Sequence, residues 1–112
     1  MTEVYKEDDL ADALRLDEKV CVLFYASWCP FCRSFLSIFD KEAQMNVRDK
    51  FLRVKIDDEA NPIWAKYDIE VVPTVIFFKD AKVRRRLDGE FGAGLREEQL
   101  RSFLHDITKK VP

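Results

Sequence analysis

One stretch of the chain, VCVLFYASWCPFC at residues 20–32, decides the fold. Its first seven residues are apolar without interruption. A short, bounded run of this kind is typical of a strand buried on both faces of a sheet, with helices on each side. Trp28, Cys29 and Cys32 follow directly. The stretch therefore predicts a buried strand that leads into a turn carrying two thiols.

Strands and helices alternate on both sides of this stretch. In chain order, the pattern predicts a short strand at 3–6, a helix at 8–16, the strand at 20–26, a helix from 29 to about 46, a strand at 51–57, a helix started by Asn61 and Pro62, a strand at 74–79, a turn at 80–81, a strand at 83–87 and a helix from about 95. We expect Phe31, Phe35 and Phe39 on the apolar face of the second helix. This order indicates an α/β fold with a mixed sheet.

The length and composition fit one compact domain spanning residues 1–112. Apolar residues make up 47% of the chain and charged residues 36%, which is enough apolar material for a core. The 19 basic and 21 acidic residues nearly balance, whereas a nucleic-acid binder usually has a basic excess. The longest apolar run is far below the roughly 20 residues of a membrane span. We therefore expect neither nucleic acid nor membrane as a partner.

The cysteines and the N-terminus indicate the compartment. Three cysteines are too few, and an odd number, for a disulfide-stapled secreted scaffold. The N-terminal residues contain no basic stretch followed by an apolar one, so no secretory signal is evident. We expect a cytoplasmic protein, in which a close pair of cysteines is catalytic or metal-binding.

Cys29 and Cys32 have the spacing of a redox pair. Cys29 lies where a helix begins, so free amides and the helix dipole favour its thiolate. Pro30 fits the first turn because no hydrogen bond is lost there. Cys32 lies one turn further and should be more buried. This arrangement predicts an exposed nucleophile, Cys29, and a protected resolving thiol, Cys32, that pass through a mixed disulfide with the substrate.

Metal binding is the main alternative for this pair. Zinc usually needs four Cys or His ligands, and the only other candidates, Cys21 and His105, lack companion spacing. We therefore expect no metal site, although an iron–sulfur cluster shared between two chains stays open. Cys21 lies in the apolar strand and is expected to be an inert buried thiol. His105 falls off the apolar stripe of the last helix and is expected at the surface.

A proline lies at the entrance of the strand at 74–79, in the sequence VVPT at residues 71–74. By itself, Pro73 reads as an ordinary loop proline before a strand. Together with WCPFC at residues 28–32, it resembles the Trp-Cys-x-x-Cys motif and the cis-proline loop of the thioredoxin family. The element order is similar to that family over about residues 3–108. The resemblance implies a thioredoxin-like fold with a mixed sheet of four to five strands between helices.

The same resemblance implies a function and a set of site residues. It implies a thiol–disulfide oxidoreductase that reduces protein disulfides, with Cys29 and Cys32 as the catalytic residues, and a role in electron transport and cell redox homeostasis. The redox-active disulfide would be the only cofactor, and a thioredoxin reductase or a small thiol would reduce it again. Pro73 would be cis and would pack on the cysteine pair, and the Val72 backbone would pair with a substrate strand. The implied substrate-binding residues are Trp28, Pro30, Phe31, Val72, Pro73 and Thr74.

The chain departs from the family at the dipeptide between the cysteines. Thioredoxins have Gly-Pro there, whereas Pro30-Phe31 is more similar to glutaredoxins and sets a different redox potential. A disulfide oxidant or isomerase and a glutathione-linked enzyme therefore stay open, and so does a binding module without turnover. We take the sequence KDAK at 79–82, in place of a Gly-Gly turn, as evidence against the glutaredoxin reading.

A second departure concerns the resolving step. Thioredoxins carry a buried acid six residues before the first cysteine, and this chain has Leu23 there. That acid is thought to accept the proton of the resolving thiol. We therefore predict a high pKa for Cys32 and slow release of the mixed disulfide near neutral pH.

Overall fold

The computed structural model describes residues 1–46 and 49–110. Its elements are β1 (Thr2–Val4), α1 (Glu7–Leu16), β2 (Lys19–Tyr25), α2 (Pro30–Met45), β3 (Lys50–Lys55), α3 (Ile63–Lys66), β4 (Thr74–Lys79), β5 (Lys82–Asp88) and α4 (Glu97–Lys110). This is the order that the sequence predicts. In the described part of the chain, no helix has the length and apolar character needed to cross a membrane.

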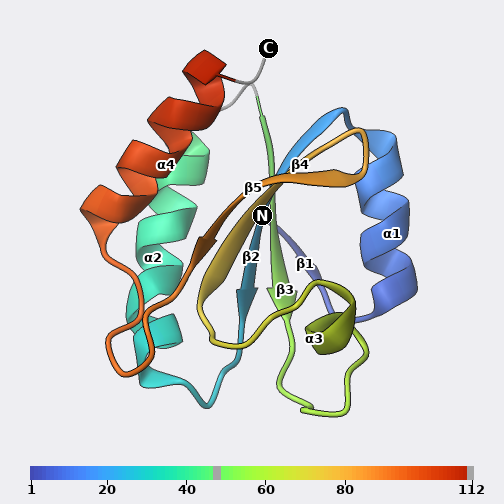
Figure 1. Cartoon of the computed structure of the whole chain (residues 1–112), viewed down its shortest axis with the longest axis vertical. Coiled ribbons are helices and arrows are strands. Elements are labelled where there is room, and N and C mark those ends of the chain that lie inside the picture. The colour runs from blue at the N-terminus through green and yellow to red at the C-terminus, as the bar shows by residue number, and fades with distance from the viewer. Residues whose placement is uncertain (47–48, 111–112) are drawn as a thin grey trace.

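Five strands form one sheet in the order β1-β3-β2-β4-β5. Strands β1, β3 and β2 are parallel, and β4 and β5 extend the sheet antiparallel. Helices α2 and α4 lie on one face, and α1 and α3 lie on the other (Figure 1). The predicted mixed sheet between helices is therefore confirmed. It places the carboxyl end of the central strand β2, where α2 begins, at one end of the sandwich.

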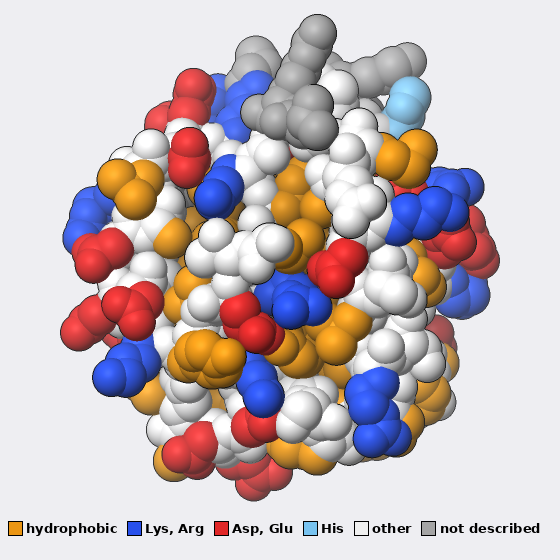
Figure 2. Space-filling model, turned by 180° about the vertical axis from the view of Figure 1, so that it is seen from behind, with side chains coloured by type: hydrophobic (Ala, Val, Ile, Leu, Met, Phe, Trp, Pro, Cys, Tyr) orange, Lys and Arg blue, Asp and Glu red, His pale blue; other side chains and the backbone are white. Residues whose placement is uncertain are grey.

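The core forms because β2 and β4 are apolar on both faces. Six of the seven residues of β2 are buried, from Val20 to Tyr25. Aromatic side chains fill the space between sheet and helices, with Phe24, Phe35, Phe39, Phe77 and Phe78 essentially inaccessible. At the surface, acidic and basic side chains are interspersed over the face seen in Figure 2, in keeping with the balanced composition.

Phe31 does not belong to this core, and our placement of it on the buried face of α2 is wrong. Its side chain is 42% exposed. A side chain in the first turn of a helix points back toward the N-terminus, here past the end of the sheet. Phe31 contacts Gly94 instead, where an added Cβ would lie 2.7 Å from the Phe31 Cβ.

A two-residue turn and a bulge shape the hairpin of β4 and β5. Asp80 and Ala81 form the predicted turn with φ values of 52° and 65°. Phe78 pairs with Val83 but Phe77 pairs with Arg85, so Arg84 is an extra residue on the edge strand. A bulge of this kind shifts the register of all later pairs.

Candidate active site

Cys29 is the N-cap residue of α2 and follows the central strand, as predicted. Its backbone is extended, with φ −93° and ψ 116°, and Pro30 begins the helix. The Cys32 amide donates to the Cys29 Sγ at 3.3 Å. The sulfur therefore accepts a hydrogen bond from one of the amides that have no intrahelical partner at the start of a helix.

Both cysteines of the pair are free thiols, and both are buried. The prediction of an exposed Cys29 is wrong, because only 5% of the residue is accessible. The reason is the Val72 carbonyl, which accepts a hydrogen bond from the Cys29 Sγ at 3.6 Å. Cys32 is fully inaccessible, so the order of burial is as predicted.

The prediction of a weakly acidic Cys32 is confirmed. The pKa of Cys32 is raised to about 12, mainly by burial and also by the neighbouring Cys29 and Asp57, while a hydrogen bond with the Ala26 backbone lowers it. Leu23 is a fully buried residue of β2, the strand that leads into Cys29, and it pairs with Arg53 on β3 and Val75 on β4. This position therefore provides no group that could accept a proton.

The loop that carries Pro73 lies beside the cysteine pair. The Val72–Pro73 peptide bond is cis. The Thr74 hydroxyl donates to the Val71 carbonyl at 2.7 Å and closes the loop. Thr74 is fully buried, so its side chain supports the loop and does not line the surface expected for it. Gly89 is required next to this loop, because an added Cβ would lie 2.3 Å from the Pro73 carbonyl oxygen.

The surface around the pair includes an aromatic side chain and is anchored to Asp57, just after the end of β3. Trp28 is 51% exposed, and its indole Nε1 donates to the Asp57 carbonyl at 3.0 Å. The Asp57 carboxylate accepts from the Ser27 amide at 2.7 Å and from the Ser27 hydroxyl at 2.5 Å. These contacts fix the turn that precedes Cys29. Pro30 is also exposed.

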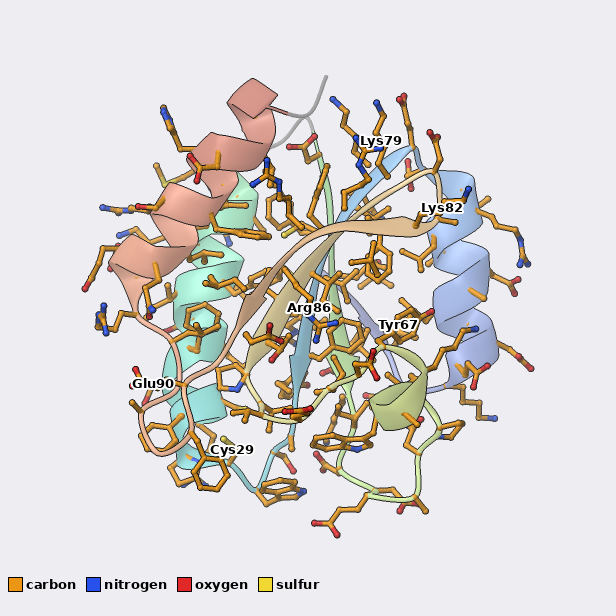
Figure 3. All side chains as sticks on the ribbon, in the orientation of Figure 1. Cys29, Tyr67, Lys79, Lys82, Arg86 and Glu90 are labelled. Carbon is orange, nitrogen blue, oxygen red and sulfur yellow. The ribbon has the colours of Figure 1, made fainter. Side chains whose placement is uncertain are left out.

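The loop between β5 and α4 adds an element that sequence reasoning missed. It folds back on itself, since Glu90 and Gly94 form an isolated bridge. Phe91 at its tip is 89% exposed. Figure 3 shows Glu90 on the same side of the molecule as Cys29. Gly89, Gly92 and Gly94 are the sequence signal of this turn.

The other candidate residues lie elsewhere in the fold. Cys21 is fully buried in β2, and burial raises its pKa, as expected for an inert thiol. His105 is exposed on α4, also as expected. Among the described residues, no cluster of three or more His, Cys, Asp or Glu side chains could hold a metal ion.

Comparisons with known proteins agree with this geometry. A family model described as thioredoxin matches residues 2–106. A thioredoxin of Mycoplasmoides gallisepticum is 39% identical over 83 residues, which are 74% of this chain and 82% of that protein. The chloroplastic thioredoxin Y2 of Arabidopsis thaliana is 39% identical over 89 residues, which are 79% of this chain but only 53% of that protein. The chain therefore spans about half the length of this chloroplastic relative. A solved structure of Plasmodium falciparum thioredoxin superimposes with a TM-score of 0.84 at 20% identity, covering 95% of this chain and 98% of that one, and so shares the fold. The chain belongs to the thioredoxin family of thiol–disulfide oxidoreductases.

Proposed function

We propose that this chain reduces disulfide bonds of protein substrates through Cys29 and Cys32. The observation that supports this most strongly is the placement of the Cys29 Sγ at the N-cap of α2, with Cys32 one turn behind it and the Val72 carbonyl 3.6 Å away. This placement combines a thiol at a helix N-terminus, a nearby second thiol and the backbone of the Val72 loop next to them.

The reaction proceeds in two exchanges. The Cys29 thiolate attacks one sulfur of the substrate disulfide, the substrate S–S bond breaks, and the other substrate sulfur leaves and takes up a proton. Cys32 then loses its proton and attacks the Cys29 sulfur. The mixed disulfide breaks, the second substrate thiol is released, and the Cys29–Cys32 disulfide holds the oxidising equivalents. Two electrons have passed from the dithiol to the substrate.

The second exchange is the slow one near neutral pH. A thiol must be deprotonated to attack, and the pKa of Cys32 is raised to about 12 by burial. With Leu23 at the position of the family's buried acid, the proton passes to solvent or to a base of the substrate. Turnover should therefore increase with pH.

The substrate would be an extended polypeptide that pairs with the Val72 backbone, a form of strand addition. The side chains of Trp28 and Phe31, next to the two cysteines in sequence, are exposed, and so is Phe91 in the loop whose Gly94 lies against Phe31. Apolar residues next to the substrate cysteine would contact these aromatic side chains. A thioredoxin reductase or a small thiol would return the pair to the dithiol. We place the protein in a reducing compartment, the cytoplasm, which agrees with its odd number of cysteines and the buried free thiol of Cys21.

A glutathione-linked or oxidising enzyme is the second candidate, because of the Pro30-Phe31 dipeptide. Our argument against the glutaredoxin reading from residues 79–82 is wrong. These residues form the turn between β4 and β5, and Figure 3 shows Lys79 and Lys82 at the opposite end of the sheet from Cys29. Their composition therefore has no bearing on the site. The redox potential separates the two candidates.

Insulin reduction with dithiothreitol as the electron source tests the proposal. The wild-type chain should accelerate the reaction, Cys29→Ser should abolish it, and Cys32→Ser should accumulate a mixed disulfide. A wild-type chain without acceleration would instead indicate a binding module. Equilibration with a glutathione buffer then gives the potential. A value below about −250 mV supports a reductase, and a value well above it supports the second candidate.

A further inference from the structure

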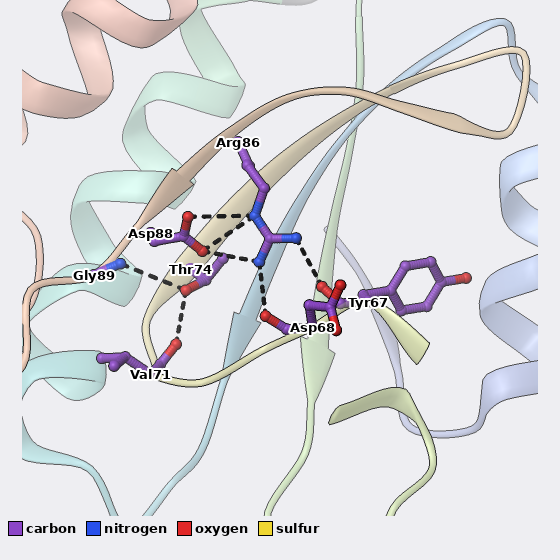
Figure 4. Close-up of polar contacts among 7 residues, drawn as sticks. All are labelled: Tyr67, Asp68, Val71, Thr74, Arg86, Asp88 and Gly89. Carbon is purple, nitrogen blue, oxygen red and sulfur yellow. Dashed lines mark hydrogen bonds and ion pairs between the residues drawn. The ribbon is translucent and has the colours of Figure 1, made fainter. Parts of the chain in front are cut away.

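Arg86 lies on the edge strand β5, and its guanidinium reaches the chain segment that leaves α3 (Figure 4). Its Nη1 donates to the Tyr67 carbonyl at 2.8 Å, and its Nη2 donates to the Asp68 carbonyl at 3.0 Å. Asp88, two residues further along β5, accepts from Nη2 at 2.9 Å and from Nε at 3.2 Å. The side chain is only 28% exposed. It therefore joins the edge strand to the end of α3 through two hydrogen bonds, while Asp88 on its own strand holds the guanidinium in place.

The segment that Arg86 holds follows a very short helix. Helix α3 contains four residues, Ile63–Lys66, and the carbonyls of Ile63, Trp64 and Ala65 accept from the amides that follow them. Arg86 supplies the donors for the next two carbonyls that it reaches, those of Tyr67 and Asp68. Tyr67 is the C-cap residue, and Asp68 has a φ of 52°, in the left-handed region. A planar guanidinium can bind two carbonyls and a carboxylate at once, which an ammonium group cannot match. Arg86 thus fixes the direction in which the chain leaves α3.

The same chain segment continues into the loop at the cysteine pair. From Asp68 it runs through residues 69–71 to Val72, whose carbonyl lies 3.6 Å from the Cys29 Sγ. On the far side of Val72, Gly89 packs on the Pro73 carbonyl, and its amide donates to the Thr74 hydroxyl at 3.4 Å. Residues 86–89 of one strand and its extension therefore support the loop both before and after Val72.

We infer that Arg86 is a positioning residue for substrate docking. By holding the carbonyls of Tyr67 and Asp68, it keeps the Val72 backbone where a substrate strand pairs next to Cys29. None of its hydrogen bonds is to a reacting sulfur, so it acts through the position of the Val72 backbone. The inference rests on the proposed function, and it names the contact that sets substrate affinity.

Arg86→Met tests the inference because it keeps the aliphatic stem and removes every polar contact. Arg85→Met is the matched control, since Arg85 is the exposed neighbour on the same strand. With insulin, we expect Arg86→Met to raise KM about tenfold with kcat little changed, and Arg85→Met to behave as wild type. With a small aromatic disulfide, which has no backbone to pair with Val72, both variants should keep the wild-type rate. Arg86→Lys should give an intermediate KM.

Amide hydrogen exchange provides a readout that needs no activity. Exchange across residues 69–72 should become about tenfold faster in Arg86→Met and stay unchanged in Arg85→Met. Unchanged exchange and unchanged KM in Arg86→Met would overturn the inference, as would an equal loss of rate with insulin and with the small disulfide. If Arg86→Met fails to fold, Asp88→Asn is used, for which we expect the same changes in smaller measure. An inactive wild-type chain would refute the proposed function and with it a role in docking, while the exchange measurement would still show whether Arg86 holds residues 69–72.

Discussion

Replacing Leu23 with Asp should supply the proton acceptor that the resolving step lacks. Leu23 is fully buried in β2, on the strand that leads into Cys29. The pKa of Cys32 is raised to about 12, so at pH 7, about five units lower, only about one Cys32 thiol in 10⁵ is ionised. In the wild-type chain, release of the substrate from the mixed disulfide should therefore accelerate about tenfold per pH unit between about pH 7 and 10.

A carboxylate at position 23 changes both the rate and its pH dependence. A positioned general base typically contributes about 10²- to 10⁴-fold, so we expect Leu23→Asp to release substrate at least about 10²-fold faster at pH 7. The slope against pH should flatten once the new carboxyl group is ionised. The variant should also be less stable by about 2–4 kcal/mol, because a carboxyl group replaces an apolar side chain that is fully inaccessible.

The assay follows one exchange only. Cys32 carries a light-removable protecting group while a mixed disulfide is formed between Cys29 and a fluorescent peptide. Light then frees the Cys32 thiol without a reducing agent, and the release of the peptide is followed in time from about pH 6 to about pH 9. Leu23→Asn is the matched control, since it has a similar size and polarity but no titratable group. An unchanged release rate in Leu23→Asp, or an equal acceleration in Leu23→Asn, would refute the reasoning.

Three further outcomes follow from the described contacts. Trp28→Ala removes a half-exposed indole and its hydrogen bond to the Asp57 carbonyl. The rate of insulin reduction should fall at least about tenfold, while Tm should drop by only about 4–8 °C. A larger loss of stability than of activity would contradict a role at the substrate surface. Gly94→Ala places a Cβ 2.7 Å from the Phe31 Cβ at a φ of 73°, so urea unfolding should show a loss of about 1–3 kcal/mol, and unchanged stability would argue against that contact. Burial raises the pKa of Cys32 from an ordinary value of 9.0 to about 12. Between pH 9 and about pH 12, the Cys32 thiol therefore ionises in the unfolded chain but keeps its proton in the folded one. Above about pH 9, the reduced protein should lose up to about 1.4 kcal/mol of stability per pH unit from this group. The oxidised protein has no Cys32 thiol to titrate, so equal pH dependences of the two forms would disprove this effect.

The sequence predicted the order of the elements because the signals for them are local. The apolar run from Val20 to Ala26 marks the central strand, and Asn61 with Pro62 marks the start of α3, where the Asn61 side chain accepts from the Ile63 amide at 3.0 Å. The cysteine pair was located for the same reason, since it follows the central strand without a gap.

The features that sequence reasoning missed depend on contacts between distant segments. The near-complete burial of Cys29 comes from Val72, which lies 43 residues further along the chain. Phe31 lies outside the core because the first turn of α2 projects past the sheet, and the spacing of apolar residues along the helix does not reveal this. Strict pairing from the turn at 80–81 would place Arg86 opposite Val75, and the extra residue at the bulge moves it opposite Ile76, on the face where Tyr67 lies.

The bulge at Arg84 also affects how the protein behaves at high concentration. β5 is an edge strand, and an unbroken edge invites another chain to pair with it and aggregate. The extra residue interrupts the row of backbone donors and acceptors, and Lys82, Arg84 and Arg85 place exposed like charges along it. The edge strand β5 is therefore poorly suited to pair with another chain, so strand pairing with the proposed polypeptide substrate is left to the backbone at Val72.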